Sequence, residues 1–338
     1  MTEHLECPLC GSSARLRHAE LSGYLAGQPH QVYGCSGCQA SFTVPRKEPA
    51  GLYDRLYQLA GDIPGYHRYE RYARLAARSS DALAMLGAAE DVYWAVARAV
   101  DDLRPNATTI LEIGSGLGYV TYALAQRGFA ARGLDVSGAA VDAARRRFGD
   151  LYVQGDLAAH AASRGGEYDV VLACEVIEHL EDPVGFVRSA LALVKPGGRL
   201  VLTTPNRSLY DENVLWETEP PPVHFWWFTE RGIQAVAERA GTTATFVDFG
   251  PYQERSPLYL QAPPPNVPTR QPTLTATLEP SRQARVARLR GRLGAALSRI
   301  RNSGLVMRLR GWRRVTGARR TVLCAVLPRP TASRDGIR

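Results

Sequence analysis

The sequence lacks any long apolar run. Although 45% of its 338 residues are hydrophobic, no stretch of about 18 uncharged apolar residues occurs, so we expect no transmembrane helix. Residues 1–6 are polar and lead directly into a cysteine pair, so the apolar segment of a secretory signal is also missing. We therefore expect a cytoplasmic protein.

One segment has no acidic residue. Residues 281–320 hold thirteen arginines and no aspartate or glutamate, whereas the rest of the chain holds 28 basic and 33 acidic residues. Apolar residues recur there at steps of three and four, which predicts a cationic amphipathic helix. The helix could lie on an anionic membrane at its inner face, grip a phosphate backbone, or dock its apolar stripe on the protein. The stripe consists of Val286, Leu289, Leu293, Leu297 and Ile300.

Cysteine is scarce outside two pairs. Four of the six cysteines form the pairs Cys7-Pro-Leu-Cys10 and Cys35-Ser-Gly-Cys38, a spacing typical of a zinc ribbon. The alternative is a pair of disulfides or four free thiols. A reducing cytoplasm disfavours the disulfides. We predict that Cys7, Cys10, Cys35 and Cys38 hold a structural zinc ion in a module over residues 1–48.

The rest of the chain predicts an α/β fold. Residues 49–104 show a helical pattern of two or three helices, whose tyrosines could form a lid or pack in the core. Short apolar strands then alternate with helices, which indicates a parallel sheet with helices on both faces. The expected strands are 110–113, 131–135, 151–154, 170–173 and 200–203, with 244–249 and 321–327 as a closing pair. The expected core is 105–250, the proline-rich connector and basic helical insertion is 251–320, and the final strand and tail are 321–338.

A glycine-rich turn follows the first strand. Residues 111–118 read Leu-Glu-Ile-Gly-Ser-Gly-Leu-Gly, so that backbone N–H groups at Gly114, Gly116 and Gly118 could approach a ligand at a helix N-terminus. Dinucleotide-binding dehydrogenases use a similar turn, so the motif alone does not identify the ligand. Asp135 ends the second strand, where a carboxylate can accept both ribose hydroxyls of a nucleoside. Asp156, after the third strand, could hold an adenine amine.

These motifs, with Tyr168-Asp169-Val170-Val171-Leu172 and Lys195-Pro196-Gly197-Gly198, resemble class I S-adenosylmethionine-dependent methyltransferases. The resemblance covers residues 105–250 and returns at 321–328. It implies a Rossmann-like fold and S-adenosylmethionine as the cofactor. It also implies that Glu112 faces the methionine end of this cationic ligand, where a dehydrogenase would place a pyrophosphate. The expected cofactor-binding residues are Glu112, Gly114, Gly116, Gly118, Asp135, Asp156 and Glu175.

The segment after the fourth strand carries the candidate chemistry. Glu175, Glu178 and His179 can share one helical face at the carboxyl edge of the sheet, and His224 lies in an aromatic segment that could return over it. The pattern resembles ubiquinone-pathway O-methyltransferases and the 2'-O-methyltransferases of small-RNA ends. The resemblance implies that these four residues hold Mg²⁺, Mn²⁺ or Zn²⁺. Alternatively, His179 or His224 acts as a general base without metal, or Glu178 and His179 only cap a helix.

We therefore predict an S-adenosylmethionine-dependent methyltransferase that methylates the oxygen of a hydroxylated small molecule such as a sugar, phenol, quinone or natural-product intermediate. The catalytic residues would be Glu178, His179 and His224. Three alternatives stay open: an RNA methyltransferase that uses the zinc module and the arginine-rich arm, a C-methyltransferase acting on a nucleotide-linked sugar, and a cofactor-binding scaffold without turnover. The oligomeric state does not follow from the sequence.

Overall fold

The main sheet contains the strands that the sequence predicts. The computed structural model describes residues 4–59, 63, 66–210, 220–260, 272–281 and 312–330. Its main sheet has the strand order β11-β14-β9-β8-β5-β6-β7. The strands are β5 (Thr109–Ile113), β6 (Ala130–Asp135), β7 (Tyr152–Gln154), β8 (Tyr168–Cys174), β9 (Val194–Pro205), β11 (Thr245–Phe246) and β14 (Val322–Pro328). The five neighbouring strands β9, β8, β5, β6 and β7 are parallel, and β14 runs antiparallel to both of its neighbours, β9 and β11. The predicted closing pair is confirmed, although β11 is shorter than expected.

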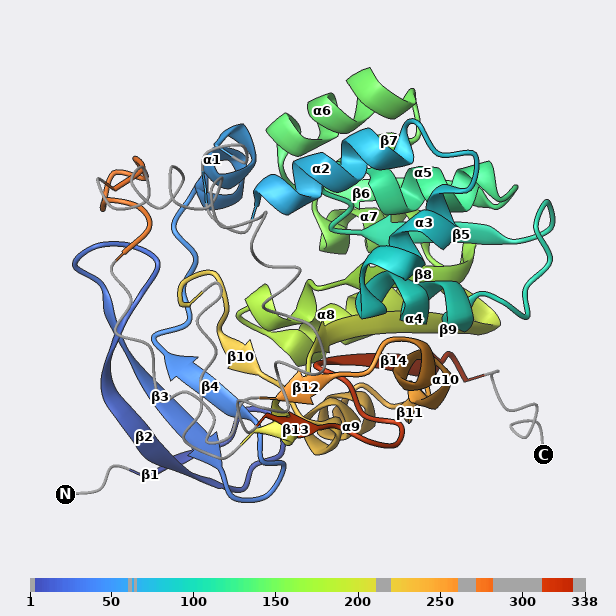
Figure 1. The fold of residues 1–338 in the computed structure, drawn as a ribbon. Helices are drawn as coiled ribbons and strands as arrows, with labels where there is room; N and C mark the ends of the chain where they lie inside the picture. Colours follow the sequence, from blue (N-terminus) through green and yellow to red (C-terminus); the bar gives the residue numbers. More distant parts are fainter. Residues whose placement is uncertain are drawn as a thin grey trace.

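Helices cover both faces of this sheet (Figure 1). Alternate residues of a strand point to opposite faces; Ile110 packs with one group of helices and Leu111 with the other. The first group is α2 (His67–Ala76), α3 (Ala82–Ala89), α4 (Asp91–Ala99), α5 (Tyr119–Gln126) and α10 (Gly250–Arg255). The second includes α8 (Pro183–Leu193) and α9 (Glu230–Arg239). The predicted Rossmann-like arrangement is therefore confirmed.

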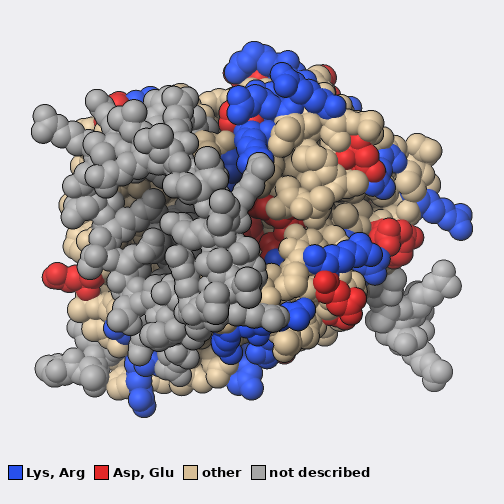
Figure 2. Space-filling view, viewed as in Figure 1, with Lys and Arg blue, Asp and Glu red and all other residues tan. Residues whose placement is uncertain are grey.

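The segment before β5 forms four helices, α1 (Leu52–Gln58) to α4, where the sequence predicted two or three. The prediction was wrong because Asp81 begins a separate helix: its side chain accepts a hydrogen bond of 3.0 Å from the backbone N–H of Ala84. α2 lies beside α6 (Gly138–Phe148), and Arg147 forms an ion pair of 2.7 Å with Glu70 between them. Figure 2 shows basic side chains gathered over these two helices.

The N-terminal sheet is completed by a strand from far along the chain. Its order is β1-β2-β3-β4-β10, with β1 (His4–Glu6), β2 (Ser13–Ser22), β3 (Pro29–Cys35), β4 (Ser41–Val44) and β10 (Trp226–Trp227). Trp226 pairs with Phe42, and both are buried in the same apolar cluster as α8 and α9. The cysteine-containing module is thus joined to the main sheet through the segment that carries His224 (Figure 1).

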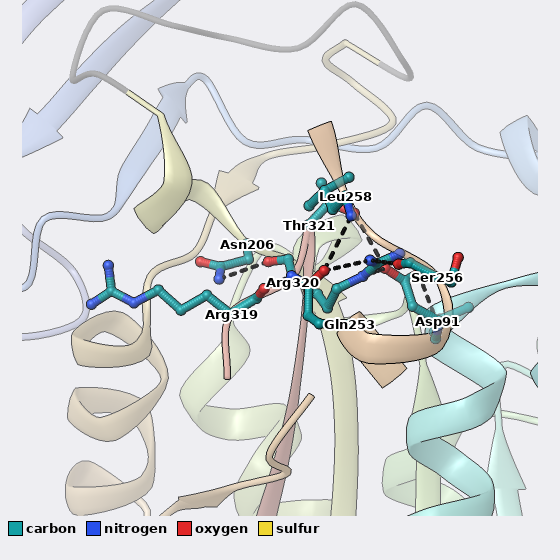
Figure 3. A network of polar contacts seen from close by, with 9 residues as sticks. Asp91, Asn206, Gln253, Ser256, Leu258, Arg319, Arg320 and Thr321 are labelled. Carbon is teal, nitrogen blue, oxygen red and sulfur yellow. Dashed lines mark hydrogen bonds and ion pairs between the residues drawn. The ribbon is translucent and has the colours of Figure 1, made fainter. Parts of the chain in front are cut away.

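The last strand is anchored by a buried arginine just before it (Figure 3). Arg320 donates hydrogen bonds to Asp91 Oδ2 at 2.9 Å and to Gln253 Oε1 at 3.0 Å, and its guanidinium lies 4.8 Å from the centre of the Tyr252 ring. Nearby, β12 (Tyr259–Leu260) pairs with β13 (Arg313–Arg314). The predicted amphipathic stripe from Val286 to Ile300 lies outside the described residues. Among the helices that the structure describes, none has the length and apolarity that crossing a bilayer requires.

Candidate functional site

A cavity of about 510 Å³ lies at the carboxyl ends of β5, β6 and β8, the edge where open α/β sheets bind ligands. Seven carboxylates line it together with one guanidinium, that of Arg68. They belong to Glu48, Glu90, Glu112, Asp135, Asp156, Glu175 and Asp182. Figure 2 shows acidic side chains at the bottom of a hollow in the middle of the molecule. This excess of acidic groups suits a cationic ligand such as S-adenosylmethionine.

The glycine turn forms one wall of the cavity. Gly114 and Gly116 line it, both with a positive φ, of 70° and 50°. A Cβ atom at Gly116 would lie 2.6 Å from the Tyr57 hydroxyl, so only glycine leaves room there. Gly118 is not among the lining residues; a Cβ at this position would meet the Tyr152 ring at 2.6 Å. Gly118 therefore serves the packing of the turn.

Two of the predicted cofactor carboxylates are buried. Glu112 is 3% exposed and accepts a hydrogen bond from the Thr121 hydroxyl, and burial raises its pKa to about 8. Asp135 accepts backbone hydrogen bonds from Gly116 at 2.7 Å and from Ser137 at 2.8 Å, and burial raises its pKa too. Each carboxylate oxygen keeps a second lone pair for a ligand. Asp135 thus braces the glycine turn while it lines the cavity.

Asp156 has a different setting from Asp135. It is exposed and begins α7 (Leu157–Arg164), where its side chain accepts a hydrogen bond of 3.0 Å from Ala159 N–H. It still lines the cavity. The structure therefore brings Glu112, Asp135 and Asp156 around one space.

Helix α1 covers the cavity, and two of its residues make contacts that no sequence motif indicates. Asp54 accepts hydrogen bonds from the Ser137 hydroxyl at 2.6 Å and from Ala139 N–H at 3.3 Å. Tyr57 lies against Gly116. These contacts join residues more than fifty positions apart, and no local periodicity marks them. Four tyrosines of the region for which the sequence suggests either a lid or core packing line the cavity: Tyr53, Tyr57, Tyr66 and Tyr69.

The segment after β8 is not the helix that the sequence predicted. Glu175 has a left-handed backbone, with φ of 54°, and its N–H donates to the Thr203 hydroxyl at 3.0 Å. This bond to β9 turns the chain before a helix can form, and only a 3-10 turn, η1 (Ile177–His179), follows. Glu175 lines the cavity but stands outside the group formed by the other predicted ligands. The prediction that Glu175, Glu178 and His179 share one helical face was therefore wrong.

Glu178, His179 and His224 converge, with their candidate ligand atoms all within 4.8 Å of one another. Nε2 of His179 lies 3.7 Å from Glu178 Oε1, and Nε2 of His224 lies 4.0 Å from the same oxygen. Nδ1 of His179 hydrogen bonds to the carbonyl oxygen of Val223 at 2.9 Å, the kind of contact that orients a metal-binding imidazole. Only His179 of the three lines the cavity. It is also the one that contacts Tyr53, edge to face at 5.9 Å between ring centres.

The four paired cysteines form a second group. Their sulfur atoms all lie within 4.8 Å of one another, with 3.7 Å between Cys7 and Cys38 and 3.4 Å between Cys10 and Cys35. A tetrahedral Zn²⁺ with Zn–S bonds of about 2.3 Å separates its sulfurs by about 3.8 Å, whereas a disulfide bond is about 2.05 Å long. The spacing therefore fits a tetrathiolate zinc site and not a pair of disulfides.

Comparison with known proteins places these features in a family. The profile of a family described as "Methyltransferase domain" matches residues 69–245, more than half of the chain. The ubiquinone biosynthesis O-methyltransferase of Vibrio parahaemolyticus serotype O3:K6 (strain RIMD 2210633) is 36% identical over 105 residues, which cover 30% of this chain and 45% of that protein. The protein of the same name from Escherichia coli O139:H28 (strain E24377A / ETEC) is 36% identical over 104 residues, covering 29% and 43%. The chain thus matches less than half the length of these relatives.

One chain of known structure with a similar fold is described as an S-adenosylmethionine-dependent methyltransferase, possible histamine N-methyltransferase, from Thermotoga maritima. It is 16% identical with a TM-score of 0.42, and the alignment covers 82% of this chain and 99% of that one. The family match, the glycine turn and the acidic cavity agree on one identity. The chain belongs to the class I S-adenosylmethionine-dependent methyltransferases.

Proposed function

We propose that this methyltransferase acts on a hydroxyl oxygen of a small molecule, and that Glu178, His179 and His224 hold a divalent cation beside the acceptor. The observation that carries the proposal is the convergence of these three side chains at the edge of the cofactor cavity. The name of the curated relatives, ubiquinone biosynthesis O-methyltransferase, supports transfer to oxygen. A cavity of about 510 Å³ has the size of a small-molecule site.

S-adenosylmethionine, when bound, supplies a methyl group attached to a positively charged sulfur. We assign its binding to residues of one wall: Gly114 and Gly116 let the backbone approach, and Glu112 faces the charge. Asp135 and Asp156 are placed to accept hydroxyl and amine hydrogens of the nucleoside. Glu175, which lines the same cavity outside the Glu178 group, belongs to this cofactor set rather than to the cation ligands.

His179 is the residue through which the Glu178 group reaches the cavity. With its Nδ1 proton donated to Val223, its Nε2 lone pair faces Glu178, as a metal ligand requires. Two imidazoles and a carboxylate suit Zn²⁺ and also Mn²⁺ or Mg²⁺, and a cation there would lower the pKa of an acceptor hydroxyl. In the metal-free alternative His179 itself takes the acceptor proton, while the buried His224 positions it.

We further propose that the four paired cysteines hold a structural zinc ion, supported by their sulfur distances. The protein would then carry two kinds of metal site. Metal content per chain separates them, because replacing a cysteine empties one and replacing Glu178 empties the other.

Product identity and metal content test the proposal together. The purified protein is incubated with methyl-labelled S-adenosylmethionine and a panel of catechols, free sugars and nucleotide-linked sugars, and the labelled product is analysed by NMR. We expect an O-methyl ether. In the Glu178→Gln variant turnover should fall at least about a hundredfold and one divalent ion per chain should be lost, while cofactor affinity stays the same. Glu181→Gln, an exposed neighbour, is the matched control and should behave as wild type.

Two results would contradict the proposal. A methyl group found on carbon, or label incorporated into RNA and into none of the small molecules, would assign the enzyme to one of the other two acceptor classes. Unchanged metal content in Glu178→Gln would show that Glu178 holds no cation, and would favour the alternative in which His179 acts as the base.

A further inference from the structure

A second cavity, of about 540 Å³, lies where the N-terminal sheet meets the main domain. Its wall includes Arg17 of β2, Arg207 of the turn η2 (Arg207–Leu209), Arg231 at the start of α9, and Arg319 before β14. None of its lining residues belongs to the cofactor cavity. It is therefore a separate space, formed only when the cysteine-containing module is docked.

The charge of this wall is positive. Among the described residues that line it, four are arginines and one, Glu230, is acidic. Arg207 is only 4% exposed, and its Nη1 donates to the Gln39 carbonyl oxygen at 3.1 Å. Arg231 and Arg319 form no ion pair with any residue that the structure describes. The side chain of Arg319 points away from the network around Arg320 (Figure 3).

The backbone reinforces this charge. Helix α9 begins at Glu230, after Thr229, whose hydroxyl accepts a hydrogen bond of 3.0 Å from Gly232 N–H. Thr229 and the first residues of α9 line the cavity, so the positive end of the helix dipole lies at its wall. A Cβ atom at Gly34 would lie 2.8 Å from Arg17 Nε. Glycine at this position therefore lets the Arg17 side chain lie flat against β3.

A zinc ion held by the paired cysteines would offset part of this positive charge. Cys35 lines this cavity, and zinc bound by four thiolates carries two net negative charges. Two of the arginines, Arg231 and Arg319, are exposed at the rim, where they remain available to a ligand.

We propose that this cavity binds a small phosphorylated molecule through its diphosphate group. Guanidinium groups bind phosphate oxygens in pairs, and a volume of about 540 Å³ is within the range of small-molecule sites and larger than a single phosphate needs. A nucleic acid would require a longer basic surface along its backbone. The site stands on its own residues and does not depend on the acceptor of the methyl group.

Titration calorimetry of the full-length, zinc-saturated protein with sodium pyrophosphate, at constant ionic strength, tests the site. We expect one saturable site per chain that prefers pyrophosphate to inorganic phosphate. Arg17→Gln and Arg231→Gln should each weaken binding about tenfold or more, as expected for a lost charged hydrogen bond. Arg15→Gln, two residues away on the same strand and outside the cavity wall, should retain wild-type affinity.

Three results would overturn the proposal. One is the absence of saturable binding of pyrophosphate to the wild-type protein. If Arg17→Gln also loses zinc in that case, the arginines stabilise the cysteine group instead. Another is equal pyrophosphate affinity in wild type and Arg231→Gln. The third is binding of an RNA oligonucleotide that Arg231→Gln weakens and pyrophosphate does not displace. S-adenosylmethionine affinity, measured in the same samples, should not change in any variant, which separates this site from the methyltransferase site.

Discussion

At the scale of single residues, we expect Glu112 to make cofactor binding depend on pH. Its carboxyl is buried in the cavity wall, and burial raises its pKa to about 8, so the group is mostly neutral at pH 6.5 and mostly charged at pH 9. A cationic ligand favours the charged form. We predict that S-adenosylmethionine affinity, measured by calorimetry, rises several-fold across this interval. In Glu112→Gln the affinity should be weaker and nearly independent of pH; a slope equal to that of wild type would assign the titration to another group.

The same carboxyl should reduce the stability of the cofactor-free protein. The pKa of this carboxyl is about 8 in the folded protein, whereas an accessible glutamate has a pKa of 4.5. Below about pH 4.5 the carboxyl is protonated in both the folded and the unfolded chain, so it costs no stability there. The free energy of unfolding then falls as pH rises from 4.5 toward 8. Glu112→Gln should therefore raise the free energy of unfolding in urea at pH 8.5 by a few kcal/mol relative to wild type, with a much smaller change at pH 5. An equal change at both pH values would contradict this account.

At the scale of elements, α1 acts as a cover fixed by Asp54. Its carboxylate holds the start of α6 through Ser137 and Ala139, next to Asp135. Asp54→Ala removes hydrogen bonds worth roughly 1 kcal/mol each, so we predict that S-adenosylmethionine dissociates about three to thirty times faster in stopped-flow measurements. Gln58→Ala, an exposed change on the same helix, is the control. Equal dissociation rates in wild type and Asp54→Ala would mean that α1 does not retain the cofactor.

Elements whose pattern is local were predictable, and those set by distant contacts were not. The strands around Ile110 and Val170 are short apolar runs, and the glycine turn is fixed by the conformations that Gly114 and Gly116 adopt. The convergence of Glu178 with His224 followed from family resemblance. The break after Glu175 arises from a bond to Thr203, and β10 exists because the N-terminal sheet needs an edge partner. Neither can be inferred from periodicity along the chain.

At the scale of the whole molecule, the N-terminal module and the main domain should unfold together. Trp226 pairs with Phe42 across the junction, and the buried cysteines share an apolar cluster with α8 and α9. We predict that Cys7→Ser lowers the Tm of the entire protein in a single transition, because zinc binding energy is folding energy. Ser36→Ala, beside Cys35, removes only an exposed hydrogen bond to the Ser13 carbonyl oxygen and should lower the Tm far less. A main domain that keeps its Tm while the module unfolds would show that the two are independent.

At the scale of the whole enzyme, we propose that transfer to oxygen depends on a cation held by Glu178, His179 and His224. The most direct measurement is turnover after treatment with a chelator that leaves the zinc of the four cysteines in place, with cofactor binding followed in the same sample. We predict that turnover is lost, that S-adenosylmethionine affinity is retained, and that adding back a divalent cation restores activity. Full turnover in the chelator, with one zinc per chain still bound, would contradict it.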